Sequence, residues 1–170
     1  MQHLVQSVER SLLSGNPYAA LSTALALPDI CGWLINPSSG SKDRYVAWFD
    51  RYLADKYVHH VGRSKTRTVF LTGNDCYALR CAFLHEGRED ITEQRARQLI
   101  EKFQFVVAPQ GWVVHCNLMN DTLQLQVDVF CTEVLDGVHR FQVDYAPYAD
   151  IVKRMSALLR IHDVSGNVIA

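Results

Sequence analysis

The sequence has little net charge and lacks the common motifs of nucleotide and acyl chemistry. Its 17 lysines and arginines nearly balance its 18 aspartates and glutamates, which leaves a formal net charge of −1. Bulk attraction to nucleic acid or to an acidic membrane is therefore not expected, and a polyanionic partner would have to be bound by a local cluster of cations. The glycines form no phosphate loop, no nucleophile elbow and no dinucleotide fingerprint.

The cysteines lack the pairing pattern of a disulfide framework or a zinc ribbon. There are five of them, an odd number, and no two form a Cys-x-x-Cys pair. Cys31, Cys116 and Cys131 lie beside apolar residues and are predicted to be small core residues. Reduced structural thiols of this kind indicate a cytoplasmic protein. We expect no signal peptide at the N-terminus, and no stretch approaches the roughly 20 apolar residues of a membrane-spanning helix.

Hydrophobic spacing indicates a mainly helical chain. The 170 residues fit a single domain over residues 1–170, and a chain of this length can fold without a metal or a disulfide. Apolar residues recur at helical spacing in several stretches, and an aromatic stripe in the third is expected to face the core. These stretches are residues 2–14, 17–36, 43–53 and 72–86, and the C-terminal third on both sides of Pro147.

Local signals place the ends of these helices and the breaks between them. The second helix is expected to kink at Pro28, and Asp43 is expected to cap the third. Asp90-Ile91-Thr92-Glu93 has the form of a capping box, which predicts a further helix that runs through Phe103. Residues 58–70 are polar and basic and are expected to form a solvated loop.

The period of the sequence changes between residues 103 and 129. Segments 103–108, 112–116 and 123–129 have the pattern of strands, with turn residues between them. The last segment alternates apolar and polar residues, so one of its faces is expected to be in water. The predicted fold is a helical bundle with an inserted small antiparallel β-meander at about residues 103–129.

One helix carries an arginine and a histidine whose spacing matches a known motif. The run Arg80-Cys81-Ala82-Phe83-Leu84-His85 resembles the R-x4-H pattern of the HEPN superfamily, whose helical domains include many ribonucleases. The preceding helices are similar to the bundle of that family, and the resemblance covers roughly residues 1–100 and the C-terminal helices. Members often carry a polar residue, commonly asparagine, directly after the arginine, whereas this chain has Cys81 there.

The resemblance implies a metal-independent endoribonuclease, of the kind found among toxins and defence effectors. His85 would be the general acid and base, because the unperturbed pKa of histidine, about 6.5, lies near operating pH. Arg80 would bind the phosphate and the transition state through its planar fork of donors. Cleavage by the RNA's own 2′-hydroxyl needs no metal or other cofactor and leaves a 2′,3′-cyclic phosphate.

The spacing of the motif predicts that one helix alone cannot assemble the site. Five residues at about 100° each leave Arg80 and His85 roughly 140° apart around the helix axis. The family resemblance implies that two such helices meet across a two-fold interface, which makes a homodimer the expected form.

Three further residues are candidates for substrate binding. Asp29 lies on an otherwise apolar helix and could pair with Arg80, or its carboxylate could be satisfied by backbone beside the proline. Asn74, like Asp75, fits a helix cap as well as a site. Cys81 lies one helical turn before His85. We predict no metal site, because the His162–Asp163 dyad has no further ligands at recognisable spacing.

The same residues are compatible with a second function. A catalytically inactive HEPN-like helical module would bind a protein or a nucleotide, and the near-neutral charge, Cys81 and the meander favour it. Strand 123–129 could offer an edge to a partner. A solvent-open basic cleft around Arg80 would favour the enzyme, whereas an Arg80–Asp29 ion pair buried in apolar contacts would favour the module.

Overall fold

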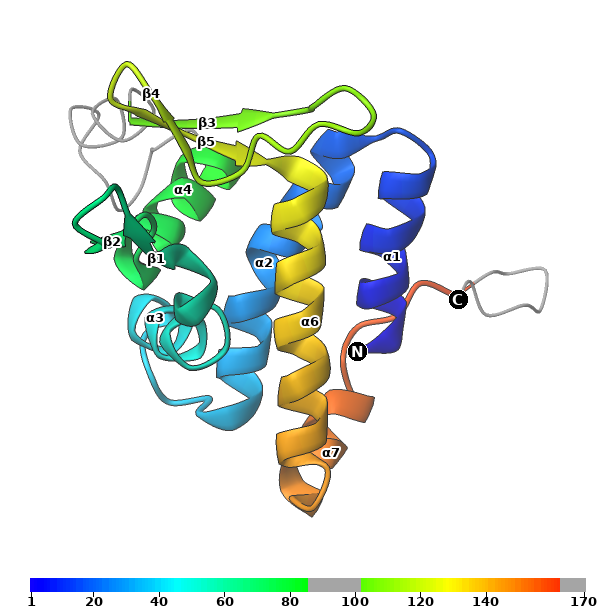
Figure 1. The fold of residues 1–170 in the computed structure, drawn as a ribbon. Helices are drawn as coiled ribbons and strands as arrows, with labels where there is room; N and C mark the ends of the chain where they lie inside the picture. Colours follow the sequence, from blue (N-terminus) through cyan, green and yellow to red (C-terminus); the bar gives the residue numbers. More distant parts are fainter. Residues whose placement is uncertain (86–101, 163–170) are drawn as a thin grey trace.

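The structure is a computed structural model that describes residues 1–85 and 102–162, with the backbone alone at His85. This part of the chain is mostly helical and carries two small sheets (Figure 1). Its helices are α1 (Gln2–Leu13), α2 (Pro17–Ile35), α3 (Ser41–Tyr52), α4 (Gly73–His85), α6 (Val127–Tyr145) and α7 (Ala149–Ser156). The mainly helical class predicted from hydrophobic spacing is confirmed.

The apolar helix α2 lies at the centre of the bundle. Asn16 caps it by accepting a hydrogen bond from the backbone N–H of Ala19, and the helix continues through Pro28. α2 contacts α1, α3, α4, α6 and α7, and Figure 1 shows it between α1, α3 and α6. By length and composition α2 could also cross a membrane, so the expectation that no stretch approaches this length was wrong. Its apolar character is accounted for by the helices that cover it.

The aromatic stripe of α3 faces the core, as expected. Tyr45, Trp48, Phe49 and Tyr52 are all buried, and they pack among the buried residues of α2, α4 and α6. The expected cap by Asp43 is wrong. Gly40 is the N-cap residue and no side chain caps α3, since the helix begins two residues earlier than the sequence pattern suggested.

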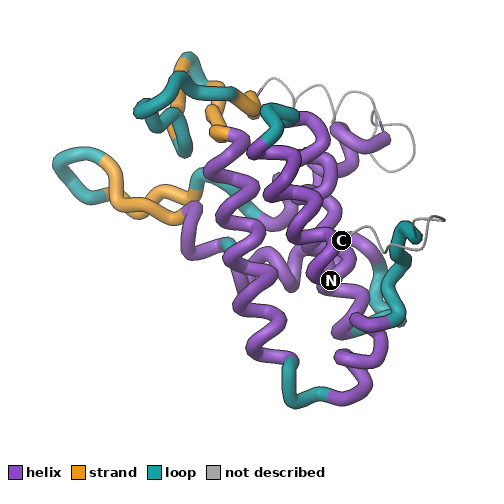
Figure 2. The backbone as a smooth tube through the Cα atoms, turned by 90° about the vertical axis from the view of Figure 1, so that its right-hand side faces the viewer, coloured by secondary structure: helices purple, strands orange, loops and turns teal. Residues whose placement is uncertain are grey.

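Residues 58–70 form a β-hairpin, so the predicted loop is wrong in conformation although it is solvated. After the short 3-10 helix η1 (Ala54–Tyr57), strand β1 (Val58–Val61) pairs antiparallel with β2 (Thr66–Val69). The β-branched residues at the ends of both strands favour extended backbone. Positive φ angles of 74° at Gly62 and 49° at Lys65 allow the tight connection. Figure 2 shows the hairpin projecting from the helical body.

The second sheet is mixed rather than an antiparallel meander. Strands β3 (Phe103–Val106), β4 (Asn117–Met119) and β5 (Thr122–Gln126) lie in the order β3-β5-β4. β3 runs parallel to β5, and only β4 is antiparallel to it. The predicted strand at 112–116 is not formed, and that segment returns the chain to the start of β4. The turn expected at Asn120-Asp121 is confirmed, with positive φ at both residues.

The polar residues of β5 are buried, which contradicts the prediction of a face in water. The Gln124 amide accepts from Asn117 Nδ2 at 2.7 Å and donates to Gln104 Oε1 at 3.1 Å. Gln126 Oε1 accepts from the backbone N–H of Val114 at 2.7 Å. Buried amides are tolerated here because neighbouring segments satisfy them. The chain passes directly from β5 into α6, so residues 127–129 are helical rather than extended.

The C-terminal helices are confirmed on both sides of Pro147, as α6 and α7. The capping box at 90–93 lies outside the described residues, as does most of the helix predicted to run through Phe103. Phe103 itself begins β3.

Candidate functional site

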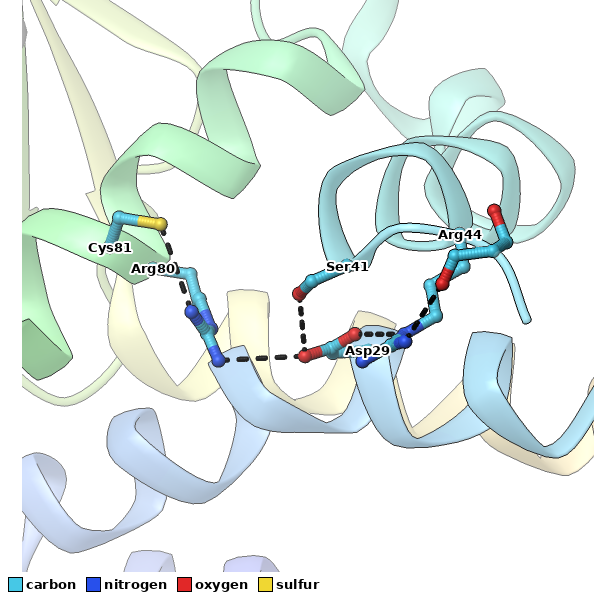
Figure 3. Close-up of polar contacts among 6 residues, drawn as sticks. Asp29, Ser41, Arg44, Arg80 and Cys81 are labelled. Atoms are coloured by element: carbon cyan, nitrogen blue, oxygen red, sulfur yellow. Dashed lines mark hydrogen bonds and ion pairs between the residues drawn. The ribbon is translucent and has the colours of Figure 1, made fainter. Parts of the chain in front are cut away.

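The candidate site is built around the carboxylate of Asp29 on α2, which is 14% exposed. Its Oδ1 accepts from Arg44 Nε at 2.6 Å, and its Oδ2 accepts from Ser41 Oγ at 2.9 Å. Ser41 and Arg44 are three residues apart in the first turn of α3, and this spacing puts them on one face. Arg44 Nη1 also donates to the carbonyl of Ser39 at 3.0 Å. Figure 3 shows these contacts converging on Asp29.

The close approach of α2 and α3 at Gly32 lets Arg44 reach Asp29. A Cβ added at Gly32 would lie 2.6 Å from the backbone oxygen of Arg44, closer than real atoms approach. Gly32 is one turn after Asp29 on the same helix, so the absence of its side chain permits the contact that places Arg44 on the carboxylate.

Arg80 approaches the same carboxylate from α4 but is bound less tightly. Its Nη2 lies 3.5 Å from Asp29 Oδ2, and its Nη1 lies 3.7 Å from the Cys81 sulfur (Figure 3). Its Nε is buried and has no hydrogen-bond partner among the described residues. The Arg80 side chain is 18% exposed. Within the described residues, this guanidinium therefore makes no short hydrogen bond.

Two aromatic residues of the core, Tyr77 and Tyr45, support the Arg80 side chain. Its guanidinium carbon lies 6.0 Å from the ring centre of Tyr77, one turn earlier on α4, which is within range for a cation–π contact. The Tyr77 ring meets Tyr45 edge-on at 5.5 Å. The Tyr45 hydroxyl and the Cys76 sulfur lie 3.3 Å apart. Burial raises the pKa of Tyr45 well above its ordinary value and raises the pKa of Cys76 to about 12, so both groups are neutral at physiological pH.

The cluster consequently has a surplus of positive charge. Two guanidiniums, Arg44 and Arg80, face one carboxylate, Asp29. Because Arg44 and Ser41 already occupy both carboxylate oxygens at short distance, Arg80 holds the weakest of the three contacts. Such an arrangement can bind an additional anion, for which a partly desolvated arginine with free donors is well suited.

The structure brings together three of the residues singled out from the sequence, namely Asp29, Arg80 and Cys81. Of the two alternatives for Asp29, the pairing with Arg80 is the one observed, at 3.5 Å. Asn74 lies in the first turn of α4, exposed and about 9 Å along the helix axis from Arg80, and makes no contact with the cluster within the described structure.

The cap of α4 is made by its neighbour Asp75, which pairs reciprocally with Thr72. Asp75 Oδ2 accepts from the Thr72 backbone N–H at 3.1 Å, and Thr72 Oγ1 accepts from the Asp75 backbone N–H at 3.2 Å. The capping role expected for Asp75 is confirmed. His85 is the last residue of α4, and its side chain lies outside the described part, so its position relative to Arg80 stays a prediction.

Sequence reasoning missed Ser41, Arg44 and Tyr77. The signal for Ser41 and Arg44 was present as a serine and an arginine three residues apart at the start of a helix. Nothing local, however, says which helix their shared face meets. Tyr77 was detectable as the residue one turn before Arg80.

His115 takes part in a separate buried cluster. Its Nδ1 accepts from the Gln126 backbone N–H at 3.2 Å, and its Nε2 lies 3.3 Å from Glu133 Oε2, which also accepts from the Tyr57 hydroxyl at 2.7 Å. The Gln126 backbone N–H satisfies Nδ1, whereas Nε2 is buried and makes no hydrogen bond of good geometry to any described residue. Over residues 1–85 and 102–162, no three acidic, histidine or cysteine side chains are grouped as a metal site.

Comparison of the chain with protein-family models, with curated proteins and with solved structures finds no match. The functional argument therefore depends on the residues themselves.

Proposed function

We propose that this chain is a HEPN-type, metal-independent endoribonuclease that acts in the cytoplasm, with Arg80 and His85 as its catalytic residues. The observation that supports this best is the surplus arginine of the Asp29 cluster. Among the described residues, Arg80 Nε is buried without a partner, and Nη2 makes a 3.5 Å contact to a carboxylate that Arg44 already pairs. A phosphate oxygen would accept from the two terminal nitrogens of Arg80, whose contacts within the fold are long, 3.7 Å for Nη1 and 3.5 Å for Nη2.

The proposed reaction is a transfer within the RNA. As O2′ attacks the adjacent phosphorus, one histidine takes the 2′-hydroxyl proton. The P–O5′ bond breaks, and O5′ receives a proton from a second histidine, which leaves a 2′,3′-cyclic phosphate and a 5′-hydroxyl. Arg80 stabilises the charge on the phosphorane, while Asp29, which Arg44 holds in place, positions Arg80.

A homodimer would supply the second histidine. Arg80 and His85 are five residues apart on α4, which places them roughly 140° apart around the axis. Two copies of α4 meeting at their C-terminal ends would put one His85 from each chain on either side of a bound phosphodiester. We expect activity per chain to fall on dilution below the dimer dissociation constant.

The test is cleavage of RNA in excess chelator by the wild type, His85→Ala, Arg80→Gln and a control, His139→Ala. His139 is exposed on α6, so its replacement should leave cleavage unchanged. We expect a loss of about 100-fold or more for His85→Ala, which removes proton transfer. The products should carry 2′,3′-cyclic phosphate ends. Equal cleavage by wild type and His85→Ala, or none by either, would contradict the proposal.

One observation favours the alternative of a catalytically inactive module that binds a protein or a nucleotide. Arg80 and Asp29 form an ion pair whose side chains are 18% and 14% exposed, and Arg80 also lies against Tyr77. A covered pair of this kind, rather than a solvent-open basic cleft, was the arrangement expected for the module. If this is its role, Arg80→Gln should lower the midpoint of urea unfolding, and neither the wild type nor the variant should cleave RNA.

A further inference from the structure

The β1–β2 hairpin concentrates positive charge on a protein that is otherwise acidic. Residues 58–72 contain three of the 17 lysines and arginines and none of the 18 aspartates and glutamates. The rest of the chain therefore has a formal net charge of −4, whereas this segment has +3. The cations are Arg63, Lys65 and Arg67, at every second position around the tip.

These cations are exposed, and they form no ion pair with any residue that the structure describes. Residues 59–67 are all exposed, and within the described part of the chain no carboxylate forms an ion pair with Arg63, Lys65 or Arg67. An ordinary solvated surface intersperses charges of both signs, so that neighbours neutralise one another. The hairpin carries charges of one sign only, so its positive electrostatic potential can attract an anionic partner.

The hairpin is ordered by its own hydrogen bonds rather than by burial. Its ladder continues inward to a bond from the Phe70 backbone N–H to the Tyr57 carbonyl at 2.8 Å. At the tip, the Lys65 backbone N–H donates to the Gly62 carbonyl at 3.2 Å. Val61 and Val69 are 46% and 45% exposed, so the hairpin adds little to the core. A two-stranded ribbon of this kind gains little stability by itself, so the exposed hairpin is better suited to binding than to supporting the fold.

The register adds a histidine to the same surface. His60 lies directly opposite Arg67 in the ladder, and such pairs share one face of a ribbon. Phosphate oxygens accept hydrogen bonds from guanidinium, ammonium and imidazole N–H groups. The hairpin presents all three kinds of donor, so it could bind several phosphates in succession.

We infer that the β1–β2 hairpin is an RNA-binding arm that contacts the sugar-phosphate backbone through Arg63, Lys65 and Arg67. This inference rests on the proposed function for the identity of the polyanion. Three residues, 70–72, join the hairpin to α4, the helix that carries Arg80 and His85, so the arm and the proposed catalytic helix are consecutive elements. Backbone contacts of this kind are independent of base sequence and sensitive to salt.

The test measures binding separately from cleavage. In a His85→Ala background, which prevents turnover, the anisotropy of a labelled single-stranded RNA is followed across a KCl series. The triple variant Arg63→Gln/Lys65→Gln/Arg67→Gln should flatten the slope of log K against log salt by about 2, since each phosphate contact on a single strand contributes about 0.7. Between 50 and 200 mM salt, the parent should lose about 18-fold more affinity than the variant.

A matched control removes the same charge elsewhere. Lys42→Gln/Lys153→Gln/Arg160→Gln replaces three other exposed cations and should leave the slope nearly unchanged. The inference would be overturned if the parent and the hairpin variant had equal slopes, or if both triple variants changed the slope equally. It would also be overturned if the parent did not bind RNA. Loss of binding to anionic phosphatidylserine vesicles with RNA binding intact would also overturn it, in favour of a membrane contact. The single variant Arg67→Gln should reduce the slope by about 0.7, and circular dichroism checks that each variant is folded.

The outcome is separable from that of the proposed function. RNA binding that depends on the hairpin, without cleavage by the wild type, would retain the arm and refute the nuclease. Cleavage that depends on His85, with RNA binding unaffected by the hairpin variant, would support the nuclease and refute the RNA-binding arm.

Discussion

The carboxylate of Asp29 connects three helices through single side-chain contacts. It lies on α2, accepts from Ser41 and Arg44 on α3, and lies 3.5 Å from Arg80 on α4. All of the charged partners are at most 20% exposed, so water screens these interactions less than it would at an open surface. Asp29 therefore contributes both to the packing of the bundle and to the orientation of the candidate catalytic arginine.

We expect Asp29→Asn to destabilise the protein by about 1–3 kcal/mol, because two partly buried guanidiniums would then lack their counter-charge. The measurement is the midpoint of urea unfolding at unchanged m value. Asp43→Asn is the matched control, since Asp43 is exposed in the first turn of α3, and it should change stability by no more than about 0.5 kcal/mol. Similar shifts for both variants would show that Asp29 has no special structural role.

At the scale of elements, glycines set how closely helices pack against α3. A Cβ at Gly32 on α2 would lie 2.6 Å from the Arg44 backbone oxygen, and a Cβ at Gly137 on α6 would lie 2.9 Å from the tip of the Trp48 ring. A Cβ at Gly32 would clash with a backbone atom, whereas a Cβ at Gly137 would clash with a side-chain atom. Only the second can be relieved by a small rotation, although Trp48 is itself buried.

We expect Gly32→Ala to be more destabilising than Gly137→Ala. Both changes gain the same helix propensity, about 1 kcal/mol, so the difference between them reports the clash alone. Overpacking of this kind costs about 1–3 kcal/mol, and the larger value is expected where backbone must move. Thermal unfolding of the two variants measures the order. The prediction fails if Gly137→Ala is the less stable of the two.

At the scale of the whole molecule, Asp144 near the end of α6 joins the C-terminal half of the chain to α3. Its carboxylate accepts from the Tyr52 hydroxyl and from Arg51 Nη2, each at 2.9 Å. The Tyr52 hydroxyl first, and then Arg51, hold the pKa of Asp144 below its ordinary value. The charged form is thus favoured in the folded state, and its contribution to stability depends on pH.

The pH dependence has a definite sign. Because the pKa of Asp144 is lower in the folded than in the unfolded state, its contribution is present above the unfolded value of about 3.9 and is lost as pH falls through the folded value. At pH 7, Asp144→Asn should therefore melt at a lower temperature than the wild type. The difference should shrink below about pH 4 and disappear in stronger acid. Glu9→Gln, on the exposed face of α1, is the control and should show no such convergence. A Tm difference that is constant with pH would rule out the carboxylate as its source.

The candidate site was partly predictable from the sequence. Arg80 stood out by its motif and Asp29 by its isolation on an apolar helix, and their contact is observed. The stronger partner of Asp29, Arg44, was not predictable, because its contact depends on how α3 crosses α2 at Gly32. Residues 58–70 were recognised as basic and solvated, but their hairpin, and hence their projection from the body, was not.

The sequence by itself determined the helices that the structure describes, because each helix satisfies its hydrogen bonds within a few residues and shows its buried face as a local period. Only the tertiary structure decided the mixed pairing of β3 with β5, the burial of Gln124 and Gln126, and the placement of two arginines on one carboxylate. These features join segments far apart in the chain. Their free energy depends on which surfaces meet, and no local pattern of residues encodes that.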